Sequence, residues 1–248
     1  MEQGGSIDWT GAILLLTAAV VLVLSGTHLH GGEESFVSSD GLEYHLPMHG
    51  LFLILVLAFV VMEIKVRNPL VPMRHFRHVS FGTSLGSNAS FHGSMLAVMT
   101  LVPILIERGY GLPPVYVFLV LLPNQSIGLF MPLIAGWIWD KYQPRLLRPA
   151  MMVMIASGFL LLWLFTEVVP VWAIPILLLP ISIGSNTFNS MNNAAIMNSL
   201  PLEDRGVASG MLETSRELGH ALGAIGAASA LALALPAGIE LLSGDLAQ

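Results

Sequence analysis

The sequence predicts an all-α fold, a polytopic transmembrane helical bundle with about seven spans. Apolar residues make up 54% of the 248 residues and charged residues only 10%, whereas a soluble domain is about a quarter charged. The apolar residues also lie in long blocks, and a helix needs a run of about 20 to cross a bilayer core roughly 30 Å thick. Short segments of alternating polarity, which would indicate an outer-membrane barrel, are absent from the sequence.

Seven apolar segments account for this prediction. They cover residues 10–26, 47–64, 79–106, 114–139, 147–166, 169–198 and 206–235. The first is expected to be a retained span, because the acidic residues before it do not form the basic start of a signal peptide. The first two segments are plain Leu, Val and Ala helices, which suits peripheral spans. The last five contain Gly, Ser, Asn and Pro, which indicates helix packing or a water-filled path.

The charges between the segments predict an orientation. The connections on one side contain most of the basic residues, namely Lys65, Arg67, Arg74, Arg77, Lys141, Arg145, Arg148 and Arg205. The connections on the other side contain Arg108 and most of the loop acids. Because cytoplasmic loops carry the excess of Lys and Arg, seven spans would place the N-terminus in the cytoplasm and the C-terminus outside.

The loop after the fourth segment carries a G-x-x-x-D-K pattern over Gly136, Asp140 and Lys141, followed by Arg145. This resembles the G-x-x-x-D-R/K-x-G-R-R loop of major facilitator transporters, although Gln and Pro replace its glycine step at residues 143–144. The resemblance implies a conformational loop in which Gly136 lets two helices approach closely. It also implies that Asp140 pairs with basic groups, so that the loop clasps and releases a neighbouring helix. The alternative is an ordinary basic cytoplasmic loop.

An ordered set of motifs resembles a narrower family, the fourteen-span drug:proton antiporters of the EmrB/QacA type. The motifs that support this resemblance lie at residues 8–11, 68–77, 121–123, 201–210 and 216–223. Residues 68–77 resemble the N/E-P-L-x-x-x-R-x-F-R connection that precedes the C-terminal bundle of these transporters. Residues 8–11 are similar to the start of their extra central helix pair. The resemblance extends from residue 7 to about residue 235.

This resemblance implies three parts: two central linker transmembrane helices in residues 1–66, a basic cytoplasmic loop in 67–78, and an incomplete C-terminal six-helix bundle in 79–248. The sixth helix of that bundle and the whole N-terminal bundle would be missing, so the chain is expected to be a fragment. Its partners would be the lipid bilayer, a small-molecule substrate, protons and the missing bundle. The expected location is the bacterial inner membrane, as a multi-pass protein.

Amide groups in two segments are candidate cavity residues. Asn186, Asn189 and Asn193 have the spacing i, i+3, i+7, which places three carboxamides on one helical face. Asn88 and His92 form a similar i, i+4 pair in the third segment. These groups would line a hydrated cavity, or they would form hydrogen bonds between helices worth about 0.6 kcal/mol each.

The seventh segment contains four ionisable residues on one face, Glu213, Arg216, Glu217 and His220. Ionisable groups inside a span are costly and are functional candidates for that reason. In one interpretation they line the transport cavity, and Glu217 with His220 handles protons, because histidine titrates near neutral pH. In the other, Glu213 to Glu217 project into the cytoplasm as a helix overhang, where Arg216 neutralises Glu213.

The leading hypothesis is a secondary active transporter that exports drugs or other amphipathic small molecules, driven by proton entry. The alternatives are a metabolite facilitator of the same superfamily and a non-transporting scaffold or truncated fragment. An enzyme is not expected, because catalytic and nucleotide-binding motifs are absent from the sequence. We expect no cofactor beyond the proton gradient as energy source. We also expect no metal site: the lack of cysteine excludes a thiolate site, and His28, His30 and His45 lie in a loop whose glycine and serine pairs imply no fixed ligand geometry. No nucleic-acid partner is expected either.

Overall fold

The computed structural model describes residues 8–27, 39–67, 69–142, 144 and 146–234, and all of their regular secondary structure is helical. The seven long helices are α1 (Trp9–Thr27), α2 (Ser39–Lys65), α3 (Val79–Ile104), α4 (Val115–Tyr142), α5 (Leu147–Phe165), α6 (Ile174–Met197) and α7 (Arg205–Ala234). Short helical turns are η1 (Met73–Arg77), η2 (Leu105–Gly109), η3 (Val171–Ala173) and η4 (Leu202–Asp204). The all-α prediction is therefore confirmed for the described residues.

Five of the described helical segments are long and apolar enough to cross a membrane. They are Glu43–Lys65, Val79–Gly109, Val115–Tyr142, Leu147–Phe165 and Val171–Met197. The first predicted span is not among these five, because its apolar stretch, Trp9–Ser25, is shorter than theirs. The last, α7, carries Arg205, Glu213, Arg216 and Glu217 within its length. The chain is thus a multi-pass membrane protein whose last helix is the least apolar.

Prolines lie inside several of these helices, and this corrects one predicted boundary. We expected the second span to begin at residue 47, but α2 begins at Ser39 and contains Pro47 in its interior. Membrane helices tolerate proline because neighbouring groups and local changes of helix pitch satisfy the freed carbonyls. Near the end of α3, Pro103 lies two residues before the start of η2, a π-helical turn.

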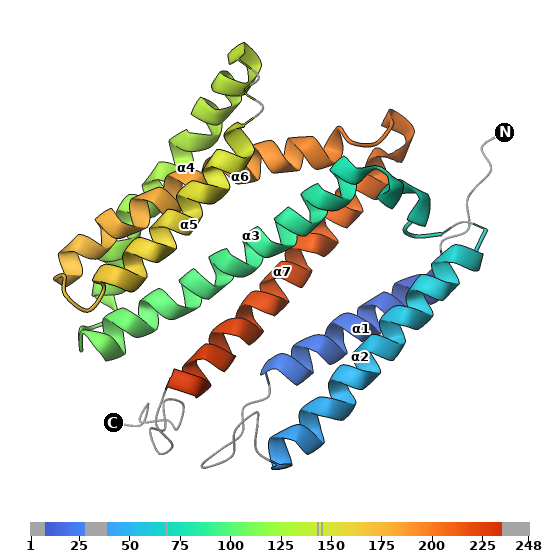
Figure 1. Cartoon of the computed structure of the whole chain (residues 1–248), viewed down its shortest axis with the longest axis horizontal. Helices are drawn as coiled ribbons and strands as arrows, with labels where there is room; N and C mark the ends of the chain where they lie inside the picture. Colours follow the sequence, from blue (N-terminus) through green and yellow to red (C-terminus); the bar gives the residue numbers. More distant parts are fainter. Residues whose placement is uncertain (1–7, 28–38, 68, 143, 145, 235–248) are drawn as a thin grey trace.

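The helices form two groups joined by one connection (Figure 1). We call α1 and α2 the linker pair, residues 66–78 the connector, and α3 to α7 the bundle. In the bundle, α3 lies beside α7, while α6 packs against both α4 and α5. The linker pair meets the bundle through α1 and α7.

Three apolar clusters hold the bundle together. The smallest joins α3, α5 and α6 through Phe91, Ile155 and Phe188, and the two larger clusters lie on either side of it along α3. One joins α3, α4 and α6 through Val98, Val120 and Ile174, with others around them. The second joins the start of α3 to the end of α6 and the start of α7, and includes Phe81 and Ile196. The two larger clusters lie toward opposite ends of α3, so the polar residues near its middle lie between them.

Glycines bring α3 and α7 into backbone contact. A Cβ atom added at Gly219 would collide with the backbone of Ala89, and one added at Gly223 would collide with the backbone of Gly93. From the other side, a Cβ at Gly93 would lie 3.0 Å from the carbonyl oxygen of Gly219. Small residues allow this close approach in membrane helices. It brings the polar side chains of the two helices together.

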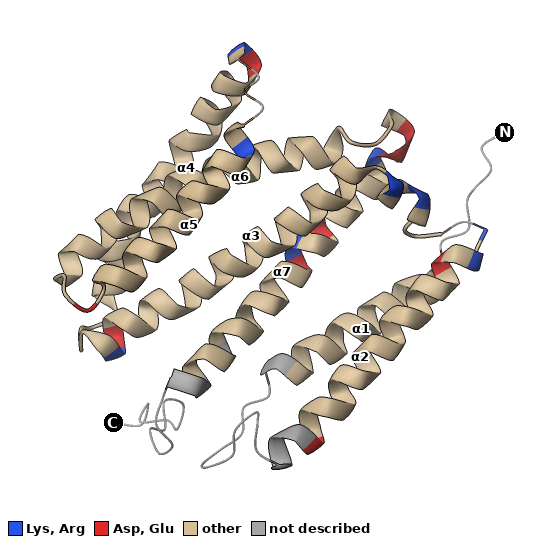
Figure 2. Ribbon diagram, viewed as in Figure 1, with Lys and Arg blue, Asp and Glu red and all other residues tan. Residues whose placement is uncertain are grey.

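The charged residues mostly mark helix ends, with one exception (Figure 2). Lys and Arg gather where α2 ends and where α3 and α7 begin, and further basic residues lie where α4 ends and α5 begins. On α7, acidic and basic residues lie part-way along the helix instead. The predicted orientation and the predicted division into domains remain predictions, although the basic ends correspond to the side expected in the cytoplasm.

Candidate functional site

The middle of α3 contains a fully buried side-chain amide, that of Asn88, which forms hydrogen bonds with α7. Asn88 is 0% exposed, and its Nδ2 donates to the carbonyl oxygen of Leu212 at 3.1 Å and to Oγ of Ser215 at 2.8 Å. The close helix approach makes these bonds short enough to form. Oδ1 of Asn88 is also buried but accepts no hydrogen bond from the described residues. Asn88 thus has a structural role on one side and an unused acceptor on the other.

One turn further along, His92 meets residues of both α6 and α7. Its ring lies 5.1 Å from the ring of His220, edge to face. Asn189 of α6 and Arg216 and Glu217 of α7 are also close enough to interact with it. His92 is 9% exposed, and its Nε2 has no hydrogen-bond partner among the described residues. The site therefore combines groups from three helices that are far apart in the sequence.

The polar cluster consists of Asn88, His92, Asn189, Arg216 and His220, together with Asn193, which lies one turn beyond Asn189 on α6. Five of its buried atoms lack a hydrogen-bond partner within the described part of the chain, namely Asn88 Oδ1, His92 Nε2, Asn189 Oδ1, Asn193 Oδ1 and Arg216 Nε. Buried polar atoms are rarely left unpaired in folded proteins. A group of them at the junction of three helices indicates space for water or for a polar ligand.

The four ionisable residues of α7 form two pairs along the helix. Arg216 Nη1 lies 2.9 Å from Oε2 of Glu213, and His220 Nδ1 lies 3.5 Å from Oε2 of Glu217. The acids point outward, with Glu213 55% and Glu217 70% exposed. Arg216 and His220 are less exposed and face His92.

These residues do not lie beyond the end of the bundle. At 1.5 Å per residue, Arg216 and His220 are about 16 and 22 Å from the start of α7, and His92 is about 20 Å from the start of α3. The ring contact between His92 and His220 places them at the same level. The ion pair between Arg216 and Glu213 forms as the overhang interpretation expected, but it forms alongside the middle of α3.

The amides of α6 divide between two neighbours. Asn189 approaches His92 of α3, whereas Asn186 lies against Gly128 of α4, where an added Cβ would be 3.1 Å from its Oδ1. Asn186 Nδ2 donates to the carbonyl oxygen of Ser182 in its own helix. The predicted stripe of three amides therefore does not share a single environment.

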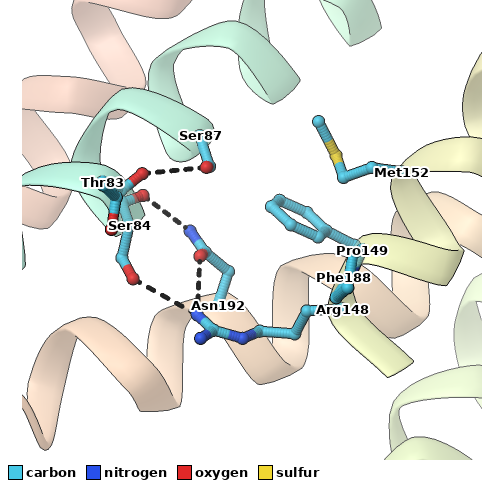
Figure 3. Close-up of a pocket in the computed structure, with 8 residues that line it drawn as sticks. All are labelled: Thr83, Ser84, Ser87, Arg148, Pro149, Met152, Phe188 and Asn192. Atoms are coloured by element: carbon cyan, nitrogen blue, oxygen red, sulfur yellow. Dashed lines mark hydrogen bonds between the residues drawn. The ribbon is translucent and has the colours of Figure 1, made fainter. Parts of the chain in front are cut away.

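A pocket of about 320 Å³ opens between α3, α5 and α6, near the basic end of the bundle (Figure 3). On its polar side, Nη1 of Arg148 donates to Oγ of Ser84 at 3.2 Å and to Oδ1 of Asn192 at 3.5 Å. Nδ2 of Asn192 donates to the carbonyl oxygen of Ser84 at 3.0 Å. Phe188 and Met152 form the apolar side.

Sequence reasoning missed this pocket. Arg148 was assigned to the cytoplasmic loop, but it lies in the first turn of α5, and its side chain points toward α3 and α6. An arginine inside the first turn of an apolar helix is the signal that would have identified it. Ser84 precedes Asn88 by four residues, so it lies on the same face of α3.

The conformational loop is only partly described. Asp140 and Lys141 are exposed at the end of α4, and Lys141 Nζ lies 5.1 Å from the centre of the Trp137 ring. Arg145 lies outside the described residues. A Cβ added at Gly136 would meet no described atom within 4 Å, so the close helix approach expected at this residue remains a prediction.

Comparison with known proteins gives a consistent family. A sequence model of the Major Facilitator Superfamily matches residues 6–224. The riboflavin transporter RibZ of Clostridioides difficile is 23% identical over 222 residues, which cover 90% of this chain and 46% of the relative. Multidrug resistance protein 3 of Bacillus subtilis is 25% identical over 88% of this chain and 41% of the relative. The uncharacterized transporter YebQ of Escherichia coli is 30% identical over 67% and 36%. The chain spans less than half the length of each.

Proposed function

Because this chain belongs to the Major Facilitator Superfamily of membrane transporters, we propose that it forms part of a proton-coupled exporter of amphipathic small molecules. The drug efflux named for Multidrug resistance protein 3 and for the multidrug efflux pump LfrA of Mycolicibacterium smegmatis supports this choice of cargo. Both come from bacteria, which supports the bacterial inner membrane as the location.

The observation that carries the proposal is the ionisable face of α7 next to the polar cluster. Glu213 and Glu217 are largely exposed midway along a helix of a membrane protein. Exposure of carboxylates to lipid at this depth would be costly, so such residues face water or another protein segment. A water-filled path on this face, closed by a second bundle, would hydrate the exposed carboxylates. Its water would also form hydrogen bonds with the unpaired atoms of the polar cluster.

In this proposal, Glu217 and His220 handle the proton, and His92 receives it from His220. The two imidazole rings are in contact, and each has a neighbouring polar group, Glu217 for His220 and Asn189 for His92. Each imidazole has two ring nitrogens, so that a proton can enter at one nitrogen and leave from the other. The amides Asn189 and Asn193 would hold water or the polar end of a substrate.

We further propose that the chain is the C-terminal portion of a fourteen-span transporter. The separation of the linker pair from the five-helix bundle supports this arrangement, as does the connector between them. In such transporters, two bundles rock about a site near the bilayer midplane. The N-terminal bundle would then be the partner that covers the exposed face of α7.

Efflux measurements in cells test the proposal. In the complete transporter, Glu217→Gln and His220→Asn are expected to abolish the dependence of dye efflux on external pH, at matched protein levels. Glu203→Gln is the control, because Glu203 is exposed in the turn before α7. We expect cells that produce only residues 1–248 to show no efflux. Unchanged pH dependence in both α7 variants would contradict proton handling by this pair.

A metabolite facilitator is the second candidate, and one relative favours it. The name of RibZ assigns riboflavin as its cargo, and riboflavin is not a drug. An ionophore that collapses the proton gradient distinguishes the two functions. It would stop proton-coupled export, but a facilitator would continue to equilibrate its substrate down the concentration gradient.

A further inference from the structure

Two carboxyl groups face each other where α1 begins and α2 ends, outside the bundle. Asp8 lies directly before α1, and Glu63 lies near the end of α2, where it is only 2% exposed. Asp8 Oδ2 and Glu63 Oε1 are both buried, and neither has a hydrogen-bond partner among the described residues. The remaining oxygens are occupied: Asp8 Oδ1 accepts from the backbone N–H of Gly11 at 2.9 Å, and Glu63 Oε2 accepts from that of Val71 at 2.8 Å.

The geometry at Gly11 shows that the two free oxygens converge. A Cβ added at this buried glycine would lie 2.6 Å from Glu63 Oε1 and closer still to Asp8 Oδ2. Both oxygens therefore surround one point and are at most about 5 Å apart. The missing side chain of Gly11 provides the room in which they meet.

Among the described residues, no cation is found to balance the two carboxylates. Within the described part of the chain, no ion pair joins a basic side chain to Asp8 or Glu63, and Lys65 and Arg67 at the same edge are exposed. The α7 residues that line a pocket with Leu70 and Val71 of the connector, among them Gly206, are uncharged. Two adjacent carboxylates in such a site cannot both be ionised at low cost, but they bind one proton between them readily.

We propose that Asp8 and Glu63 form a proton-binding site in the linker pair, with one proton shared between Asp8 Oδ2 and Glu63 Oε1. When the proton is present, one carboxyl group donates to the other, and both free oxygens are satisfied. When it leaves to water, two negative charges face each other. Because Glu63 also holds the backbone of Val71, the site joins α1, α2 and the connector at one point. The site is separate from the polar cluster and does not depend on the proposed transport function.

Infrared spectroscopy of the full chain in lipid tests for the proton. We expect the carbonyl band of a protonated carboxyl group at neutral pH, and we expect it to be lost in both Asp8→Asn and Glu63→Gln. Each amide keeps the backbone hydrogen bond of the residue it replaces and presents an N–H to the other carboxylate, so both variants should fold. Glu203→Gln, a change at an exposed acid, should keep the band. A band that is absent from the wild type, or unchanged in both variants, would overturn the proposal.

Thermal unfolding provides an independent measurement. The folded state would hold a proton that separated carboxyl groups release at neutral pH, so the stability of the wild type should fall as the pH rises. In Asp8→Asn, the loss of stability that comes from the shared proton should disappear. Its melting temperature should therefore decrease less than that of the wild type between neutral and alkaline pH. An identical pH dependence in the wild type and in Asp8→Asn would rule out the shared proton even if the variants were otherwise stable.

Discussion

Asn88 shows how much a single amide contributes when it lies between membrane helices. It donates two hydrogen bonds to α7 and is fully buried. We expect Asn88→Ala to lower the free energy of unfolding by about 0.6–1.7 kcal/mol, the range measured for side-chain hydrogen bonds between membrane helices. Denaturation of the purified protein in mixed detergent micelles measures this change.

Ser126→Ala is the matched control for that experiment. Ser126 donates only to the carbonyl oxygen of Leu122 in its own helix, so its loss should change the stability little. If Asn88→Ala were no less stable than Ser126→Ala, the bonds from α3 to α7 would contribute nothing, and Asn88 would be available for another role.

For single residues, the spacing along one helix predicted which side chains share a face. Contacts between side chains of different helices could not be predicted from the sequence. The i, i+3 spacing of Glu213 and Arg216 indicated a shared face, and the structure pairs them. The contact of His92 with His220 joins residues 128 positions apart, and no local pattern specifies such a pairing. The partners of Arg148, Ser84 and Asn192, likewise lie on other helices, so its place in the first turn of α5 could have marked it as a candidate but not shown what it binds.

The contact between α3 and α7 depends on glycine at specific positions. We expect Gly219→Ala to destabilise the chain by about 1–3 kcal/mol, the usual cost of overpacking, because the new Cβ would collide with the backbone of Ala89. Backbone cannot move aside as a flexible side chain can, so the helices would have to separate. Thermal melting in detergent gives the measurement.

Gly226→Ala makes the same chemical change on the same helix without the collision. No described atom lies within 4 Å of a Cβ at that position. Alanine is the better helix former by up to about 1 kcal/mol, so this variant should be as stable as the wild type or more stable. Equal destabilisation by the two variants would show that the cost lies in the helix itself and not in the contact with α3.

The elements themselves were the most predictable part of the molecule. Long apolar runs located all seven helices, because a helix that crosses a bilayer must be apolar over most of its length. A predicted helix boundary was wrong at Pro47. A proline usually marks the start or end of a helix, but this one lies inside α2. Which helices are neighbours could not be predicted from the residues alone, because apolar surfaces of similar composition do not specify a partner.

For the whole molecule, the placement of basic residues predicts which ends of the helices face the cytoplasm. The chain contains no cysteine, so single cysteines can be introduced without a background. We expect Glu203→Cys, between α6 and α7, to react with a membrane-impermeant thiol reagent only after the cells are opened. Glu167→Cys, between α5 and α6, should react in intact cells.

The unmodified chain is the control, and it should give no labelling under either condition. The reverse pattern would mean that the orientation is inverted, with the basic ends outside. Labelling of both positions from the same side would be inconsistent with α6 as a span, although its helical segment is long and apolar enough to cross the membrane.

The contact between α3 and α7 also has a consequence for the order of assembly during synthesis. The hydrogen bond from Asn88 to Leu212 joins residues 124 positions apart. When α3 enters the membrane, its partner has not yet been translated, and three further long helices, α4, α5 and α6, must follow before α7 emerges. Until then, the amide of Asn88 and the imidazole of His92 have no α7 groups to meet. A nascent chain that stops before α7 would therefore keep these polar groups exposed in the membrane, where quality-control proteases can recognise it as incomplete.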